Sequence, residues 1–399
     1  MFSSAAKPLF DKLHFAEQDK MHDMPAYQLT CAGENMMGRL QDRLISLTLT
    51  DNRGFEADQL DIELDDSDGL LALPKRNVNI AVALGWKESG LIDKGSFTVD
   101  EVEHSGSPDR LIIRARSADM TAGFLVQRER SFHQKMVGDI VRTIAAEHQL
   151  TAVINPTLDK QIIAHLDQAN ESDANLLSRL GQLFDAIATV KQDRLLFMPL
   201  GEAKTASGKV LPKITITRAS GDSHRFSIAG RDNYAAVKAY YQDRQLTKRG
   251  EVIVGKNIST TKEEKKEQLT PPKKRRKTKK TKPSPEVKTA PTDSTQLNNL
   301  STNVANYDNL KVLRHIYVNQ KNAHRAAQAE WQRLQRGVAS FSMTLARGQP
   351  ELFTELPVNV YGWKPEIDNA NWIITRVVHT LSSQCYTTAI ELEMKIKDN

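Results

Sequence analysis

Hydrophobic and polar residues alternate along the first part of the chain. The alternation is clearest in residues 44–50, where the apolar positions are Ile45, Leu47 and Leu49, and in residues 60–65, where they are Leu60, Ile62 and Leu64. A period of two predicts half-buried antiparallel strands. Further apolar runs follow at 78–84, 97–102 and 111–115, separated by Gly and Asn/Asp turns. These strands predict a first β-barrel-like domain over residues 24–118, after an N-terminal arm at 1–23.

The pattern changes to helical spacing in the next region. Met136, Val137, Ile140, Val141 and Ile144 form one apolar stripe, and a second comprises Leu176, Leu177, Leu180, Leu183 and Phe184. Ser172 is a candidate N-cap for the second helix. Short strand signals lie near Val153, at 195–198 and at 213–217. Residues 119–247 are therefore predicted to be a mixed α+β domain.

The chain then loses its apolar residues. Residues 260–296 carry no aromatic side chain and almost no large apolar one. Such a segment cannot bury enough surface to offset its ordering entropy. Residues 248–308 are therefore predicted to form a disordered, basic linker.

Periodicity resumes in the last 91 residues, 309–399. A helix is predicted over about 319–335, with Gly337 just beyond it as a C-cap. Strand signals follow at 339–345, 356–361, 372–380 and 386–394, and predict a second β-barrel-like domain. The predicted fold class is thus α+β and β-rich, with two similar small β-barrel domains flanking a mixed α+β region.

The two β regions share a local pattern. The first contains VNI and GW at 78–80 and 85–86, and the second reads VNVYGW at 358–363. The strands at 97–105 and 372–380 both fit [FW]-x-[VI]-x-x-V-x-H-[ST]. The next strand begins seven residues after the histidine in each case, at Leu111 and at Tyr386. The pattern indicates two similar β domains in one chain.

Composition and charge narrow the class of protein. The 399 residues suit two to four domains, and no run of about 18 apolar residues predicts a membrane anchor. No secretory signal is expected at the N-terminus. Two cysteines cannot form a disulfide framework, and we expect them to be reduced in the cytoplasm. Residues 261–290 hold 12 Lys/Arg and 4 Asp/Glu, so the rest of the chain carries −2 of the total charge of +6.

The basic tract at 273–282 is the main candidate binding segment, a possible polyanion contact. Basic runs bind nucleic acid through counterion release. No aromatic residue interleaves with this one, so base stacking is not offered, and a solvated linker is the favoured interpretation. The candidate contacts are Lys273, Lys274, Arg275, Arg276, Lys277, Lys279, Lys280 and Lys282.

No sequence motif predicts catalysis, a cofactor or a metal. His104 and His379 occupy matching positions in the two β regions, where strand-end histidines bonded to backbone are favoured over metal ligands. The acidic residues between Asp61 and Asp68 alternate with apolar ones, which favours a solvated strand face and turn over a metal site. Cys31 has no basic neighbour or histidine in sequence to activate it.

Several long motifs resemble the late-control-D family, the tail hub proteins of contractile-tailed phages. They include GSFTVDEVEHSG at 95–106, HLDQANESDANLLSRL at 165–180 and AEWQRLQRG at 329–337. The most distinctive are GQPEL at 348–352, LPVNVYGWKPEID at 356–368 and WIITRVVH at 372–379. The resemblance covers about residues 25–245 and 310–395. The family that it indicates is related to the hub half of type VI secretion spikes.

The resemblance implies a structural baseplate hub in the virion tail, assembled in the cytoplasm of the host bacterium. It implies a homotrimer with two similar β-barrel domains per subunit, so that three chains present six. Such a trimer can join the trimeric central spike to the hexameric tail tube. The implied partners are the spike protein, the tube protein and other baseplate components. No catalytic residue is required.

Two alternatives differ in class. One is a nucleic-acid-binding late-gene regulator acting through 273–282, which the confinement of positive charge to one segment disfavours. The other is an enzyme, such as a wall-degrading lysozyme fused to the hub. The segment between the folded halves is too polar and too short for such a domain.

Overall fold

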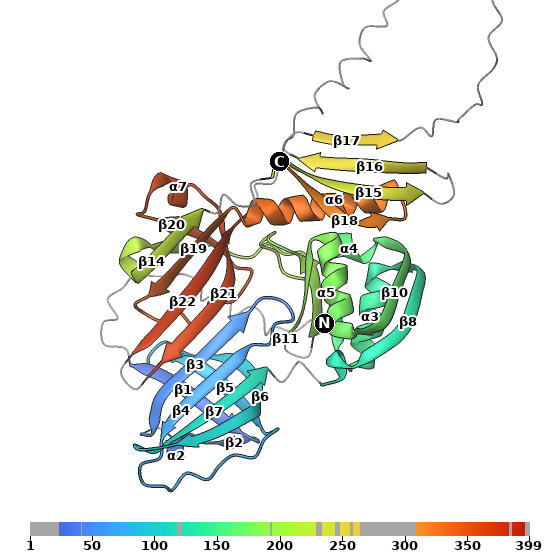
Figure 1. Cartoon of the computed structure of the whole chain (residues 1–399). Coiled ribbons are helices and arrows are strands. Elements are labelled where there is room, and N and C mark those ends of the chain that lie inside the picture. Colours follow the sequence, from blue (N-terminus) through green and yellow to red (C-terminus); the bar gives the residue numbers. More distant parts are fainter. Residues whose placement is uncertain are drawn as a thin grey trace, which may run out of the picture. The chain divides into compact units, whose positions relative to one another are not determined.

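The computed structural model describes residues 24–40, 42–117, 122–191, 194–228, 234–243, 248–255, 258–263, 309–382 and 385–395. The chain divides into two compact units. The first comprises Met1–Asp232 with Gln332–Asn399, and the second comprises Asn233–Trp331. Strands dominate both units (Figure 1). The described part of the chain is therefore β-rich with mixed α+β content, as predicted. The N-terminal arm and the basic tract lie outside the described residues.

The first β region is an antiparallel sheet in the order β3-β4-β7-β6-β5-β1-β2. Leu60, Ile62 and Leu64 are buried, as their alternation predicted. Ile45 is only half-buried, because a bulge between Leu44 and Ser46 puts Leu44 into the core instead. The elements are β1 (Pro25–Cys31), β2 (Glu34–Asn35), α2 (Met37–Leu40), β3 (Leu44–Asn52), β4 (Gln59–Asp65), β5 (Asn79–Trp86), β6 (Gly90–Ser105) and β7 (Arg110–Ser117).

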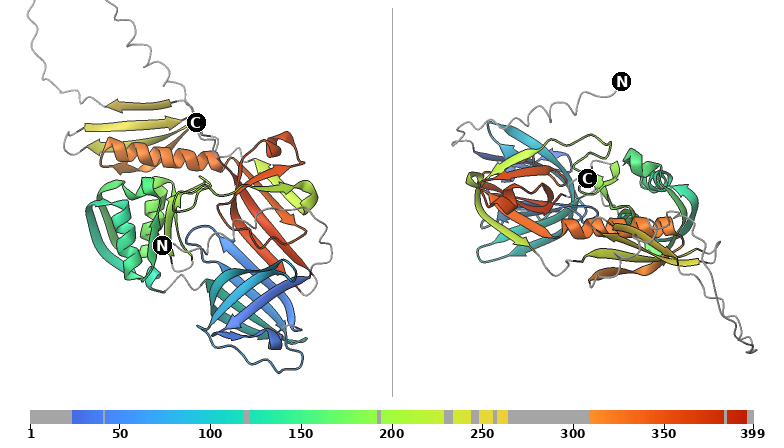
Figure 2. Two further views of the ribbon diagram at one scale, coloured as in Figure 1. Left: turned by 180° about the vertical axis from the view of Figure 1, so that it is seen from behind. Right: turned by 90° about the horizontal axis from the view of Figure 1, so that it is seen from above.

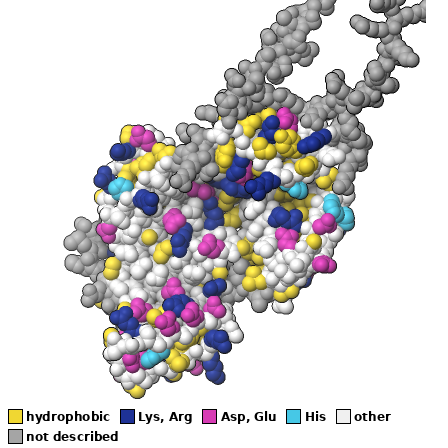
Figure 3. All heavy atoms as spheres, viewed as in Figure 1, with side chains coloured by type: hydrophobic (Ala, Val, Ile, Leu, Met, Phe, Trp, Pro, Cys, Tyr) yellow, Lys and Arg dark blue, Asp and Glu magenta, His cyan; other side chains and the backbone are white. Residues whose placement is uncertain are grey.

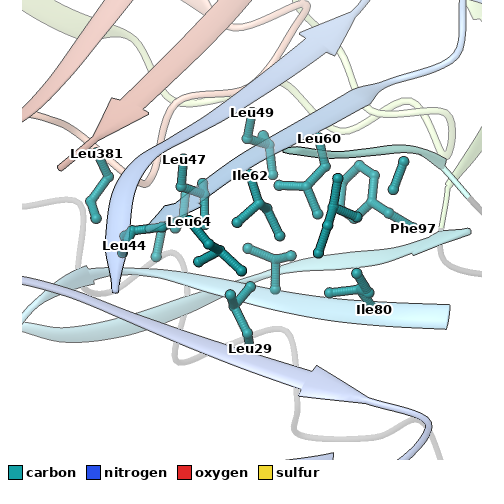
Figure 4. Packing of buried hydrophobic residues seen from close by; sticks show 14 of the residues in the cluster. Leu29, Leu44, Leu47, Leu49, Leu60, Ile62, Leu64, Ile80, Phe97 and Leu381 are labelled. Atoms are coloured by element: carbon teal, nitrogen blue, oxygen red, sulfur yellow. The ribbon is translucent and has the colours of Figure 1, made fainter. Parts of the chain in front are cut away.

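One hydrophobic core fills this region. Figure 4 shows side chains from several strands pointing toward one another, among them Leu29, Leu60, Ile80 and Phe97. Leu381 also packs in this core, although it belongs to a strand that begins more than 250 residues after the last strand of this region. The core therefore includes a contribution from the C-terminal part of the chain.

The second β region has a separate core. Its elements are β13 (Ile214–Thr217), η2 (Arg218–Ser220), β14 (Gly221–Ile228), β19 (Ala339–Leu345), β20 (Pro357–Tyr361), α7 (Pro365–Asp368), β21 (Trp372–Leu381) and β22 (Tyr386–Met394). β13 pairs in parallel with β20, and β14 pairs antiparallel with β19. Residues 214–228 thus belong to this sheet, whereas the sequence placed them in the mixed domain. Strand pairing across more than 100 residues leaves no local sequence signal.

The two regions also share a structural irregularity. The pairing of β6 with β7 shifts register between Val99 and Glu101, and that of β21 with β22 shifts between Ile374 and Arg376. When the histidines of the two shared motifs are aligned, these bulges coincide. Each bulge is followed by a cross-strand ion pair, Glu101–Arg114 in one region and Arg376–Glu391, with the charges exchanged, in the other.

The mixed region of the chain carries three α-helices, one short 3-10 helix and two small sheets. Its elements are η1 (Ala122–Leu125), β8 (Gln127–Met136), α3 (Val137–Glu147), β9 (Thr151–Ile154), α4 (Pro156–Asp159), β10 (Ile162–Ser172), α5 (Asp173–Phe184), β11 (Ala186–Lys191) and β12 (Arg194–Pro199). The Ser172 hydroxyl accepts a hydrogen bond from the Asn175 amide, which confirms the predicted N-cap. β8 and β10 form a two-stranded antiparallel sheet of their own.

The second unit is a four-stranded sheet with one helix along it (Figures 1 and 2). The strands are β15 (Ala236–Asp243), β16 (Lys248–Gly255), β17 (Ile258–Glu263) and β18 (Leu310–Tyr317), and the helix α6 (Gln320–Arg336) begins in this unit. The predicted linker start at 248 is therefore wrong. Val252, Ile253 and Val254 are buried in β16 and supply an apolar run at the edge of the polar segment. No described helix is long and apolar enough to cross a membrane.

Candidate functional site: the joint between the two β regions

Strand pairing joins the two β regions into one sheet. β21 lies antiparallel to β3, and the paired positions run from Arg376 with Asn52 to Leu381 with Leu47. Figures 1 and 2 show the sheet passing from β22 and β21 to β3 and β4, which lie side by side in that order. Main-chain hydrogen bonds therefore connect the two β regions directly. We define the joint as this pairing together with the side chains that flank it.

An aromatic cluster packs on one side of the joint. The Trp86 indole N–H donates to the Gly348 carbonyl at 2.9 Å, and the Gly348 amide donates to the Tyr386 carbonyl at 2.7 Å. The Arg347 guanidinium carbon lies 3.9 Å from the centroid of the Trp86 ring, within cation–π range. The cluster thus connects β5 of the first region to the loop and strand β22 of the second.

A second cluster contains partly buried charges. The Lys191 ammonium bonds to the carboxylates of Asp51, at 3.0 Å, and Asp58. Burial, and then the charge of Asp51, raise the pKa of Asp58 to about 6. Burial alone would lower the pKa of Lys191, but the two carboxylates outweigh it and the net shift is upward. This cluster ties β11 of the mixed region to β3 and the loop after it.

Lys94 lies near these charges, and no carboxylate of the described residues bonds to it directly. Its ammonium donates to the Leu352 carbonyl at 3.3 Å. Burial lowers the pKa of Lys94 to about 8. The lysine therefore carries its charge at neutral pH at a cost in folding free energy.

We expect this cost to appear in the pH dependence of stability. Between about pH 8 and the unfolded lysine pKa of about 10.4, the unfolded chain binds the proton and the folded chain does not, so stability rises with pH. Lys94→Met should flatten that rise and raise stability at neutral pH. Urea unfolding at a series of pH values measures both effects. An unchanged slope in the variant would contradict the assignment to Lys94.

A third cluster joins both β regions to the mixed region through arginines. Arg53 contacts Glu355 at 2.6 Å and Glu393 at 2.5 Å. Arg336 makes a bidentate ion pair with Asp185, and both side chains are buried. Burial raises the pKa of Glu355, whose carboxylate also accepts from the Gly201 amide at 3.0 Å. These long side chains thus connect the first β region, the second β region and the mixed region.

His104 and His379, which occupy matching positions in the sequence, do not come together in one site. His104 is part-exposed on β6 and lies 3.2 Å from the Asp66 carboxylate, so its partner is a side chain. His379 is fully buried beside the hydroxyls of Thr388 and Tyr386, each 3.0 Å from Nδ1. Burial, and then the charge of Lys94, lower the pKa of His379. Within the described ranges, no group of three or more His, Cys, Asp or Glu side chains is arranged to hold a metal.

The other sequence candidates differ in outcome. The charges of the acidic run are exposed or half-buried, and Glu63 and Asp68 pair with arginines. Figure 3 shows Asp/Glu and Lys/Arg side chains intermixed on this first region. Asp66 is an exception, because it is buried and accepts from the Leu71 amide.

Cys31 is half-buried, and burial raises the pKa of its thiol. All eight candidate residues of the tract at 273–282 lie outside the described residues.

Comparison with known proteins identifies the class. The family model "Phage tail baseplate hub (GPD)" matches residues 52–385. The chain is 44% identical over 374 residues to a probable baseplate hub protein of Escherichia phage 186, with 94% of each chain covered. It is 42% identical, with the same coverage, to a probable baseplate hub protein of Escherichia phage P2.

Solved structures share the fold. The 43 kDa tail protein of prophage MuSo2 from Shewanella oneidensis superposes with a TM-score of 0.60 at 12% identity, over 92% of this chain and 97% of that one. At that identity the likeness concerns the fold alone. From the family match and the two close relatives, the chain belongs to the phage tail baseplate hub family. The resemblance drawn from the sequence motifs is thereby confirmed.

Proposed function

We propose that the chain is a structural hub that assembles as a homotrimer and joins the central spike to the hexameric tail tube. The observation that carries the proposal is the pair of β regions with a shared motif and a shared bulge, joined edge to edge by β3 and β21. Three such chains present six similar units around one axis, which suits a threefold partner on one side and a sixfold partner on the other.

The ends of the sheet support assembly with other copies. β14 is a terminal strand of the 13-stranded sheet and pairs only with β19 among the described strands. Six of its eight residues are exposed. A strand of this kind offers main-chain groups to a neighbouring chain. The partners we propose are a second and third copy, the spike protein, and the tube and other baseplate proteins.

The proposed role is mechanical and needs no catalytic residue. The joint combines ion pairs around Lys191 and Arg53 with packed aromatic rings at Trp86 and Tyr386. The alternative role, a nucleic-acid-binding regulator acting through 273–282, is disfavoured because the rest of the chain carries a net −2. We place the protein in the virion tail after assembly in the bacterial cytoplasm.

Light scattering tests the trimer. Three chains of 44.7 kDa give about 134 kDa, and we expect this mass at both low and high salt. A variant lacking 273–282 should give a trimer as well, because the proposal assigns assembly to the β regions and not to this tract. A monomer that becomes trimeric on co-expression with the spike protein would also support the proposal. A dimer, or a monomer under both conditions, would contradict it.

A further inference from the structure

Two histidines face each other across the two-stranded sheet of the mixed region. His133 on β8 and His165 on β10 are direct cross-strand partners. Their Nδ1 atoms lie 3.0 Å apart and their ring centroids 4.6 Å apart. His165 is half-exposed, so solvent reaches the pair. Cross-strand partners project from the same face of a sheet, and here both present a nitrogen to one point.

The surrounding residues orient one of the rings. The Asp167 carboxylate lies 2.6 Å from His165 Nε2 and accepts from the Ser131 hydroxyl at 2.5 Å. The hydroxyl, and then the histidine, lower the pKa of Asp167. A carboxylate only accepts hydrogen bonds, so His165 carries its proton on Nε2. Its Nδ1 therefore offers a lone pair toward His133.

We propose that His133 and His165 bind a divalent transition-metal ion through their two Nδ1 atoms. Imidazole suits nickel, copper and zinc, and metal-bound histidines usually donate their other N–H to a carboxylate, as His165 does. His133 becomes a ligand when its proton moves to Nε2. Because no group of three or more ligand side chains occurs among the described residues, water completes the coordination shell.

The separation of the nitrogens selects the class of metal. Two nitrogens that are each about 2.1 Å from one ion lie about 3.0 Å apart when they meet at a right angle, and about 3.4 Å apart at the tetrahedral angle. The observed 3.0 Å matches the right angle. That geometry is typical of Ni²⁺ or Cu²⁺ in a tetragonal field, whereas Zn²⁺ would require the rings to separate.

The bound ion would stabilise the two-stranded sheet of β8 and β10, which has few strand contacts of its own. β8 and β10 pair only with each other among the described strands. A two-stranded sheet is marginal by itself and depends on packing of one face, supplied here by Phe132 and Leu166. An ion on the opposite face cross-links the strands at a point that those apolar contacts do not reach. Binding to the folded state alone then stabilises the chain.

Calorimetric titration of Ni²⁺ into the full chain, made without a histidine tag, tests the site. We expect one ion per chain, loss of binding in the His133→Ala/His165→Ala double variant, and an affinity roughly 10- to 100-fold weaker in Asp167→Ala. His104→Ala is the matched control. It removes a part-exposed histidine that also has an aspartate partner but has no second histidine, and should leave the affinity unchanged.

Electron paramagnetic resonance of the Cu²⁺-loaded chain identifies the ligands. The wild type should show coupling to two imidazole nitrogens, and either single histidine variant should show coupling to one. Ni²⁺ should also raise the thermal unfolding midpoint of the wild type and not that of the double variant. Equal affinity in the wild type and the double variant, or no binding to the wild type, would overturn the proposal.

Discussion

Replacing Asp185 with asparagine is expected to lower the free energy of unfolding by about 3 kcal/mol, because it leaves a buried arginine without its carboxylate partner. The Arg336 side chain is only 4% exposed, and both terminal nitrogens of its guanidinium donate to the Asp185 carboxylate. Glu393, 3.8 Å away, remains as a weaker partner, which places the loss at the lower end of the range for broken buried pairs. Urea unfolding followed by circular dichroism measures the change.

The substitution isolates the charge. Asparagine keeps the side-chain shape and tolerates the left-handed backbone of Asp185, whose φ is 50°. The control is Asp139→Asn, which breaks an exposed pair with Arg142 and should cost less than about 1 kcal/mol. The double variant Asp185→Asn/Arg336→Met should recover part of the loss, since it also removes the buried cation. Equal stabilities of Asp185→Asn and Asp139→Asn would contradict the prediction.

The local elements of the fold could be predicted from the sequence. The alternation at Leu60, Ile62 and Leu64, the two helices and the Ser172 cap are all found in the structure. Met136, the first member of the first stripe, is instead exposed and precedes α3 as its N-cap. These signals arise within a few residues of one another, because strand and helix periods and caps are local properties. Ile45 departs from its alternation because a bulge shifts the strand register, and no residue in the sequence marks that bulge.

The joint could not be predicted in the same way. Its contacts connect residues that are far apart in the chain, such as Trp86 with Gly348 and Lys191 with Asp51. The same limit explains why the sequence pattern predicts β13 and β14 in the mixed domain, whereas they pair with strands of the second β region. The sequence did relate His104 to His379, but the structure places one beside solvent and buries the other. Matching positions in a repeat need not have matching environments.

The family, in contrast, could be predicted because long motifs carry it. GQPEL at 348–352 is one of these motifs, and the structure gives a physical reason for its glycine. Gly348 lies against the face of the Tyr386 ring, where its amide bonds to the Tyr386 carbonyl and its own carbonyl accepts from Trp86. The residue type at 348 therefore decides whether the two β regions can close on each other at the joint.

Gly348→Ala is accordingly expected to destabilise the chain by about 3 kcal/mol, at the upper end of the range for overpacked cores. A Cβ at this position would lie 2.4–2.5 Å from three atoms of the Tyr386 ring. The ring cannot move aside freely, because it is 1% exposed and its hydroxyl lies 3.0 Å from His379 Nδ1. Thermal unfolding of the variant and the wild type measures the loss, and light scattering shows whether assembly is lost with it.

Gly38→Ala is the matched control for this substitution. Gly38 lies in α2, and a Cβ there meets no atom within 4 Å. Alanine favours a helix over glycine by up to about 1 kcal/mol, so this variant should be as stable as the wild type or slightly more stable. If Gly348→Ala unfolded at the same midpoint as Gly38→Ala, the close packing of Gly348 on Tyr386 would not hold the joint. The shared sheet of β3 and β21 and the ion pairs of Arg53 with Glu355 and Glu393 would then have to carry the connection between the two β regions.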